Sequence, residues 1–174
     1  ILLCILQTEM LTLEGIAQYF IAFENETSKF FALKDLYGYI SLSQCIIYCN
    51  STKRVEDLYL SLSEENFPVC RIHSNMDKND RTNAYNEFIN GKYRVLISSN
   101  VTARGIDIQQ VSTVINFDIP KCPRAYLHRI GRSGRWGRKG VGINFITEYD
   151  VSKIKEIEQY YNTEIKEFPE SLIN

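Results

Sequence analysis

Short apolar runs alternate along this chain with stretches in which apolar residues recur every three to four positions. The runs are rich in Ile, Val, Tyr and Phe, and the central ones are apolar nearly throughout. Continuous apolarity of this kind is typical of a strand that is covered on both faces. We therefore predict six strands, at residues 19–23, 45–49, 69–73, 94–98, 114–117 and 142–147.

The intervening stretches predict helices, each with one apolar face. They cover residues 29–37, 53–65, 80–90 and 152–161. Strands that alternate with helices predict an α/β fold with a mostly parallel sheet of about six strands, right-handed crossovers and helices on both faces. We expect a single domain at residues 13–174, preceded by an N-terminal arm at residues 1–12.

The composition is that of an ordinary soluble domain. The chain has 174 residues, of which 44% are hydrophobic and 24% charged, which fits one globular domain. It carries 20 Lys and Arg against 21 Asp and Glu, a net charge of -1, so the overall charge gives no support for a nucleic-acid partner. The composition excludes collagen, a disordered tail and a disulfide-dense miniprotein.

The cysteines argue against a metal site and for a reducing environment. Five cysteines and two histidines are present, and no Cys-x-x-Cys pair occurs, so we expect no bound metal. We expect a reducing compartment, the cytoplasm or alternatively the nucleus.

The apolar opening at residues 1–6 is too short to span a bilayer and lacks a basic flank, so we expect no membrane association. Because the chain does not begin with Met, we expect it to be part of a longer protein.

The strongest chemical signal is a basic segment at residues 121–139, which holds seven Lys and Arg, one His and no acidic residue. Within it Arg129, Arg132, Arg135 and Arg138 recur every three residues, with glycines between them. Guanidinium groups match phosphate oxygens bidentately, and glycines let backbone N–H groups approach an anion. The segment favours binding to a polyphosphate or a nucleic-acid backbone, the alternative being a solvated basic loop.

A second group of polar residues follows the strand predicted at residues 94–98. Ser98 and Ser99 stand at the strand end, where hydroxyls can donate to phosphate oxygens. Asp107 could accept from a ribose hydroxyl. The alternative is a capping cluster with a buried pair of Arg104 and Asp107.

Other signals are weaker when taken alone. Lys78 and Arg81 lie at a predicted helix start with mixed charges, which is usually only solvated. His73 at a strand end is more often structural than catalytic, and Trp136 more often packs than stacks on a base. In open parallel sheets ligands bind outside the carboxyl ends of the strands. We therefore expect the polar residues that follow the strands, including the stretch after Pro120, to meet at that edge.

Several chemistries have no matching motif. The chain contains no Gly-x-x-x-x-Gly-Lys-Ser/Thr phosphate loop, no Gly-x-Ser-x-Gly elbow and no His-Glu-x-x-His pair. No acidic strand end offers a Mg²⁺ site. The sequence therefore has the character of half an active site, able to contact phosphates but not to grip a metal–triphosphate unaided.

Four segments closely resemble motifs of the C-terminal RecA-like domain of DEAD-box RNA helicases. Residues 46–51 resemble motif IV, residues 103–107 motif V, residues 114–120 the element after it, and residues 128–138 motif VI. The match runs from about residue 11 to residue 169 and is nearest to the translation initiation factor 4A type. The resemblance implies a RecA-like three-layer sandwich that belongs to an ATP-dependent RNA helicase.

The resemblance also implies roles for particular residues. Arg132 and Arg135 would be arginine fingers that reach the γ-phosphate of ATP, and His128 and Arg129 would couple to the companion domain. Gly105 and Asp107 would contact the nucleotide. The residues implied in RNA binding are Asn50, Ser51, Lys78, Arg81, Ser99 and Arg104. ATP and Mg²⁺ would be held by an N-terminal RecA-like domain of the same protein, and RNA would be the main partner.

Departures from the family pattern fall on the RNA side. Lys78 replaces the usual Gln, Ser74-Asn75 replaces Gly-Asp, and Ser98-Ser99-Asn100 replaces Thr-Thr-Asp. An alternative function is an RNA- or scaffold-binding module of an mRNA-decay or storage helicase, with the acidic C-terminal helix as its docking surface or as a merely solvated face. A third option is half of a DNA translocase.

Overall fold

A computed structural model describes residues 12–99, 111–131, 133 and 139–172. The strands are β1 (Ile16–Ala22), β2 (Cys45–Tyr48), β3 (Cys70–Ile72), β4 (Val95–Ser98), β5 (Thr113–Asn116), β6 (Gly140–Ile146) and β7 (Lys166–Glu167). The helices are α2 (Glu26–Ile40), α3 (Thr52–Glu64), α4 (Lys78–Ile89), α5 (Pro123–Ile130) and α6 (Val151–Tyr161), with short 3₁₀ turns η1 (Glu148–Asp150) and η2 (Glu170–Leu172).

The seven strands form one parallel sheet in the order β3-β4-β2-β5-β6-β1-β7. Its longest pairing joins β1 to β6, from Ile16 opposite Gly140 to Ala22 opposite Ile146. All carboxyl ends of the strands consequently lie at one edge of the sheet, which we call the carboxyl edge, and all amino ends lie at the opposite edge, the amino edge.

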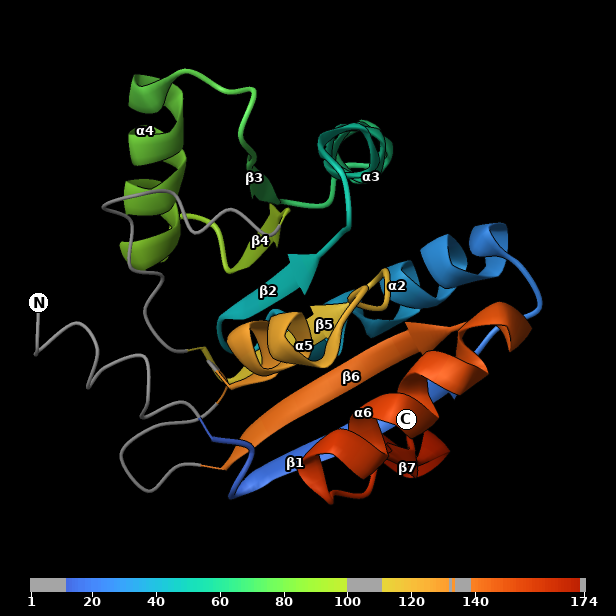
Figure 1. Cartoon of the computed structure of the whole chain (residues 1–174). Coiled ribbons are helices and arrows are strands. Elements are labelled where there is room, and N and C mark those ends of the chain that lie inside the picture. The colour runs from blue at the N-terminus through green and yellow to red at the C-terminus, as the bar shows by residue number, and fades with distance from the viewer. Residues whose placement is uncertain (1–11, 100–110, 132, 134–138, 173–174) are drawn as a thin grey trace, which may run out of the picture.

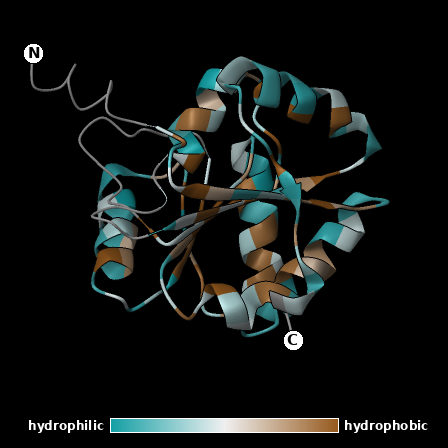
Figure 2. Cartoon of the chain, turned by 90° about the horizontal axis from the view of Figure 1, so that it is seen from below, coloured by the Kyte–Doolittle hydropathy of each residue, from teal (hydrophilic) through white to brown (hydrophobic). Residues whose placement is uncertain are grey.

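Two layers of helices cover the sheet (Figure 1). Helices α2 and α3 pack on one face in a cluster with alternate residues of the central strands, such as Ile47 and Ile97. Helices α4, α5 and α6 pack on the other face with Ile46 and Leu96. Figure 2 shows brown, hydrophobic positions gathered between the layers and teal positions on the outer surfaces of the helices. The continuous apolarity of the strands thus reflects burial on both faces, and the predicted three-layer α/β fold is confirmed.

Local sequence signals begin two of the helices at the carboxyl edge, α2 and α3. Asn25 accepts from the backbone N–H of Ser28 at 2.9 Å and caps α2. Ser51 accepts from the backbone N–H of Arg54 at 3.2 Å and caps α3. Each side chain satisfies one of the free N–H groups of a first turn.

Two elements were missed by the periodicity. Helix α5 has no clear helical periodicity because it contains only eight residues and buries Tyr126, Arg129 and Ile130, one of which is charged. Pro123 at its start and Gly131 after its end are ordinary helix-boundary signals. Strand β7 contains only Lys166 and Glu167, both exposed, so it has no apolar signature.

Candidate functional site

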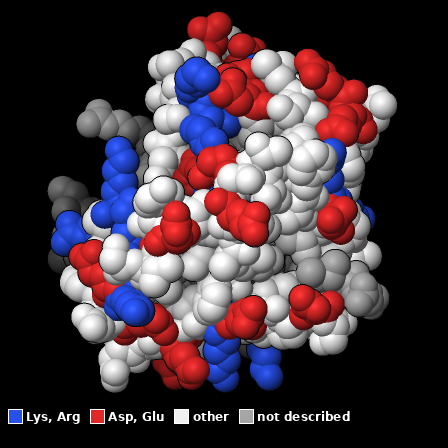
Figure 3. All heavy atoms as spheres, turned by 90° about the vertical axis from the view of Figure 1, so that its right-hand side faces the viewer, with Lys and Arg blue, Asp and Glu red and all other residues white. Residues whose placement is uncertain are grey.

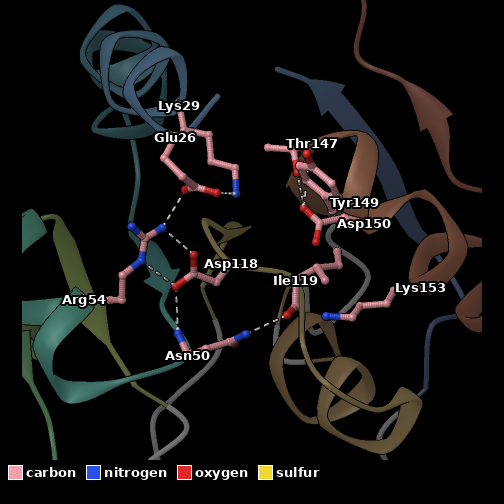
Figure 4. Close-up of a pocket in the computed structure, with 10 residues that line it drawn as sticks. All are labelled: Glu26, Lys29, Asn50, Arg54, Asp118, Ile119, Thr147, Tyr149, Asp150 and Lys153. Atoms are coloured by element: carbon pink, nitrogen blue, oxygen red, sulfur yellow. Dashed lines mark hydrogen bonds and ion pairs between the residues drawn. The ribbon is translucent and has the colours of Figure 1, made fainter. Parts of the chain in front are cut away.

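Polar side chains do gather at the carboxyl edge, as predicted. Asn50 and Ser51 follow β2, His73 follows β3, Ser99 follows β4 and Asp118 follows β5. A cavity of about 460 Å³ lies where β2, β5 and β6 end (Figure 4). Its lining residues are Glu26, Lys29, Asn50, Arg54, Asp118, Ile119, Thr147, Tyr149, Asp150 and Lys153.

Asp118 and Arg54 form the central ion pair of this cavity. Arg54 donates from Nη2 to Oδ1 of Asp118 at 2.6 Å and from Nε to Oδ2 at 3.3 Å, and the backbone N–H of Asn50 also donates to Oδ2. Burial opposes ionisation of Asp118, but these donors outweigh it and hold its pKa below the usual range. The hydrogen bond to Asp118 in turn raises the pKa of Arg54. Asp118 and Arg54 are therefore both charged and are held in place by these hydrogen bonds.

Lys29 is buried beside this pair although it is a lysine. Its ammonium donates to the carbonyl oxygen of Phe117 at 3.1 Å and lies 3.2 Å from Oε1 of Glu26. Glu26 also accepts from Arg54 at 2.7 Å. Acidic and basic groups therefore alternate around the cavity, and Figure 3 shows them interspersed over this side of the molecule. This arrangement compensates the buried charges.

Among the described residues Arg129 is the largest fully buried side chain, with 1% of its surface exposed. Its guanidinium donates to Oδ1 of Asn116 at 3.1 Å, to the carbonyl oxygen of Asp118 at 2.8 Å and to Oδ1 of Asn50 at 2.6 Å. Burial lowers the pKa of Arg129 to about 10, which leaves it charged at neutral pH. In this structure Arg129 joins α5 to the ends of β2 and β5.

The polar network continues beneath α5. Asn116 donates to Oδ1 of Asn144 at 2.8 Å, and Asn144 donates to the hydroxyl of Tyr126 at 3.2 Å. Tyr126 donates to Gln18 at 2.6 Å, and Gln18 donates to Thr163 at 2.8 Å. Buried polar groups thus find partners from β5 to the segment after α6. Periodicity gave no sign of this network, because it is made of residues far apart in sequence.

The residues predicted to contact RNA differ in their exposure and in their hydrogen bonds. Asn50 is engaged internally by Arg129 and by the carbonyl oxygen of Ile119, whereas Ser51 and Lys78 are exposed. The Nε atom of Arg81 and the Oγ atom of Ser99 are buried and have no hydrogen-bond partner among the described residues. Buried polar atoms without partners are uncommon in folded proteins. Both atoms belong to the part of the carboxyl edge near β4 and α4.

The described residues after Pro120, 121–131 and 133, lead away from the carboxyl edge, contrary to our expectation for this stretch. Helix α5 runs back across the sheet, and Ser133 forms a bridge with Val111, ahead of the amino end of β5. Ser133 is fully buried, and its hydroxyl donates to the carbonyl oxygen of Ile130 at 2.8 Å. Helix α5 and Ser133 thus lead from the carboxyl edge to the amino edge, because a parallel crossover must return the chain to the amino edge before the next strand.

The remaining predicted site residues lie outside the described ranges, namely Arg104, Gly105, Asp107, Arg132 and Arg135. His128 is described and lies half-buried in α5. Among the described residues, no group of three His, Cys, Asp or Glu could hold a metal ion. The same described part of the chain contains no helix that is both long and apolar enough to cross a bilayer.

Comparisons with known proteins agree on one family. Residues 28–137 match the model of the helicase conserved C-terminal domain. The chain is 52% identical over 165 residues to the ATP-dependent RNA helicase FAL1 of Yarrowia lipolytica, covering 95% of this chain and 42% of that protein. It is 48% identical over 168 residues to eukaryotic initiation factor 4A of Caenorhabditis elegans, covering 97% and 42%. The chain thus spans about two fifths of the length of these relatives.

Solved structures give the same result. The Saccharomyces cerevisiae protein Dbp5 bound to RNA and ADP BeF3 has a TM-score of 0.83 and 35% identity, over 92% of this chain and 43% of that one. The isolated C-terminal domain of the DEAD-box protein Dbp5 has a TM-score of 0.81 and 36% identity, over 92% and 93%. The similarity therefore extends over nearly the whole chain and corresponds to one domain of those proteins.

Proposed function

Because this chain belongs to the helicase conserved C-terminal domain family, as the C-terminal domain of a DEAD-box RNA helicase similar to initiation factor 4A and FAL1, we propose that it forms one wall of a cleft that hydrolyses ATP and opens short RNA duplexes. The other wall would be an N-terminal RecA-like domain of the same protein. The observation that carries the proposal is the pair of unpartnered buried atoms at the carboxyl edge, Nε of Arg81 and Oγ of Ser99.

RNA would bind along this edge through its backbone. Arg81 and Ser99 would contact phosphate or ribose oxygens, and the exposed Lys78 and Ser51 would lie on the same path. Lys78 is a point charge and can contact phosphate without base selectivity. Arg104 would be a further residue that contacts the RNA. Asn50 would act mainly by holding the edge in place, since its amide is already bonded to Arg129. Binding of this kind is largely independent of sequence and weakens as salt rises.

The nucleotide side would lie at the amino edge, toward which α5 and Ser133 lead. Guanidinium groups and glycines suit phosphate oxygens, so the residue types of Arg132, Arg135, Gly105 and Asp107 fit ATP. Hydrolysis of ATP would supply the free energy that opens the RNA duplex. Arg132 and Arg135 would donate to the phosphate oxygens and stabilise charge in the transition state. The described residues include no metal cluster, and we assign Mg²⁺ to the companion domain.

A joined-domain experiment tests the proposal. This chain, placed behind the N-terminal half of the Yarrowia lipolytica FAL1 helicase, should hydrolyse ATP in the presence of RNA, whereas the chain alone should not. Arg132→Ala and Arg135→Ala should each lower the rate by about 10³–10⁵-fold. The matched control is Arg124→Ala, an exposed arginine of α5, which should leave the rate unchanged. Full activity of the Arg132→Ala/Arg135→Ala double variant would refute the finger assignment.

A scaffold-binding surface is a second candidate. Structures of Dbp5 with gle1 and nup159 are among the similar ones. In this chain, Glu156, Glu164, Glu167 and Glu170 are exposed on and after α6, a surface that suits a basic partner. Replacing these four residues by Gln should abolish binding of a basic scaffold peptide without changing ATP hydrolysis. If hydrolysis falls instead, the surface belongs to the enzyme.

A further inference from the structure

A carboxylate on α3 holds one side chain of β3 and one of the residue that follows it. Oε1 of Glu56 accepts a hydrogen bond from Nε of Arg71, and Nε2 of His73 lies 2.6 Å from the same oxygen. The guanidinium of Arg71 lies over the ring of Tyr59, 4.2 Å from its centroid. His73 is buried, with 5% of its surface exposed. The cluster lies apart from the Asp118 cavity, next to the chain that leads into α4.

The hydrogen bonds of His73 fix which nitrogen carries the ring proton. The backbone N–H of Asn75 lies 3.2 Å from Nδ1, and since an amide can only donate, Nδ1 must be the acceptor. Nε2 therefore carries the proton and donates to Glu56. In this arrangement the carboxylate selects the tautomer, and the tautomer supplies the acceptor that the backbone of Asn75 requires.

This link orders the turn before α4. Residues 74–77, which we call the 74–77 turn, connect His73 to α4, and the N–H of Met76 donates to the carbonyl oxygen of His73 at 3.3 Å. Asn75 makes a second tether to α3, from Nδ2 to Oγ1 of Thr52 at 3.4 Å. Helix α4 begins at Lys78 without a side-chain cap from Asp77. The start of α4 is therefore set largely by the turn and its tethers to α3.

Arg71 helps to keep the carboxyl group of Glu56 ionised, as the hydrogen bond from His73 requires. Burial opposes ionisation of Glu56, but the hydrogen bonds from Arg71 and His73 outweigh it and lower its pKa. An ionised carboxylate can accept two donors on one oxygen, and such hydrogen bonds are about twice as strong as neutral ones. Arg71 is in turn held by its stacking on Tyr59.

We propose that Glu56 is a positioning residue for RNA: through His73 it orders the 74–77 turn and so sets the direction in which α4 presents Lys78 and Arg81. The inference rests on the proposed function, in which those two side chains contact the RNA backbone. Glu56 itself touches no RNA in this scheme.

The first test measures RNA affinity. In the joined protein, Glu56→Ala should weaken binding of a fluorescein-labelled oligouridine by about tenfold, the equivalent of one lost charge-assisted hydrogen bond. Glu56→Gln keeps an oxygen acceptor and should recover part of the affinity. The matched control is Asp57→Ala, which removes the neighbouring acidic group of α3, an exposed partner of Lys53, and should change the affinity by less than about twofold.

The second test separates positioning from general stability. His73→Asn retains an acceptor near the position of Nδ1 but no donor toward Glu56, so Glu56→Ala should have no further effect in that background. In the isolated chain, ¹⁵N spectra should show Nδ1 of His73 unprotonated and the Asn75 amide protected from exchange. Glu56→Ala should remove both signatures, while thermal melting should show that the fold remains.

The outcomes are distinguishable. Unchanged RNA affinity and unchanged Asn75 protection in Glu56→Ala would overturn this inference and leave the proposed function standing. Absence of oligouridine binding by the wild-type joined protein would overturn both. Equal losses in Asp57→Ala and Glu56→Ala would show that only charge matters, and would overturn the positioning role.

Discussion

Arg129 and Asn50 are joined by a partly buried hydrogen bond of 2.6 Å although 79 positions separate them in the chain. Asn50 directly precedes Ser51, the cap of α3 at the carboxyl edge. Arg129 lies in the last turn of α5, which delivers the chain to Ser133 at the amino edge. One guanidinium thus connects the proposed RNA side of the domain with the segment that leads to the proposed nucleotide side.

The geometry of Arg129 predicts that lysine cannot replace it. A guanidinium reaches three oxygens here, whereas a compact ammonium lacks the rigid fork. Arg129→Lys should lower the free energy of unfolding by about 1–3 kcal/mol, measured by urea denaturation of the isolated chain. The same exchange at the exposed Arg124 should have almost no effect. If the two variants were equally stable, the three hydrogen bonds of Arg129 would not contribute to the stability of the fold.

Asp118 predicts a pH-dependent contribution to stability. Its folded pKa is depressed, so the contribution is present above the unfolded pKa, about 3.9, and is lost as the pH falls through the lower folded pKa. Asp118→Asn should therefore cost about 1–3 kcal/mol at neutral pH. The difference between wild type and variant should shrink below about pH 4. A difference that stays constant down to acid unfolding would show that the charge of Asp118 is not responsible.

The sequence predicted the strands well because both faces of the sheet are buried. Each of the six predicted strands coincides with an observed one, although β1 begins at Ile16 and β6 at Gly140. Apolar runs report burial directly. Helix α5 was missed since a buried arginine breaks its apolar face, and β7 was missed because its pairing with β1 involves only two exposed residues.

Residue type suggested the candidate site residues, but it gave no information on their environment. Ser99 lies at the carboxyl edge as expected, whereas Arg129 and Asn50 bond to each other. A motif read along the chain shows which groups could meet a phosphate. It cannot show that an arginine is already held by amide oxygens from other strands, since those partners are brought together only by the fold.

The cysteines predict selective thiol chemistry. Burial raises the pKa of Cys45 and Cys49 strongly and that of Cys70 to about 12, and thiolates are the reactive species. Cys122 is exposed. A thiol-reactive chromophore at pH 8 should therefore react rapidly with Cys122, and Cys122→Ser should remove one fast equivalent. Full urea unfolding should release all five thiols of the wild-type chain. Fast reaction of Cys45 or Cys49 in the folded chain would contradict their burial.

Tyr126 predicts the strength of the polar network beneath α5. Its hydroxyl donates to Gln18 and accepts from Asn144, so Tyr126→Phe leaves Oε1 of Gln18 without that donor in a buried place. The loss should cost about 1–3 kcal/mol in urea denaturation, whereas Tyr160→Phe, at a side chain 66% exposed, should cost almost nothing. Adding Gln18→Leu to Tyr126→Phe should restore part of the lost stability, because removing both partners of a buried hydrogen bond leaves fewer polar atoms unsatisfied than removing one. If the two losses simply add, the hydroxyl does not contribute through Gln18, and the network is held by Asn144 alone.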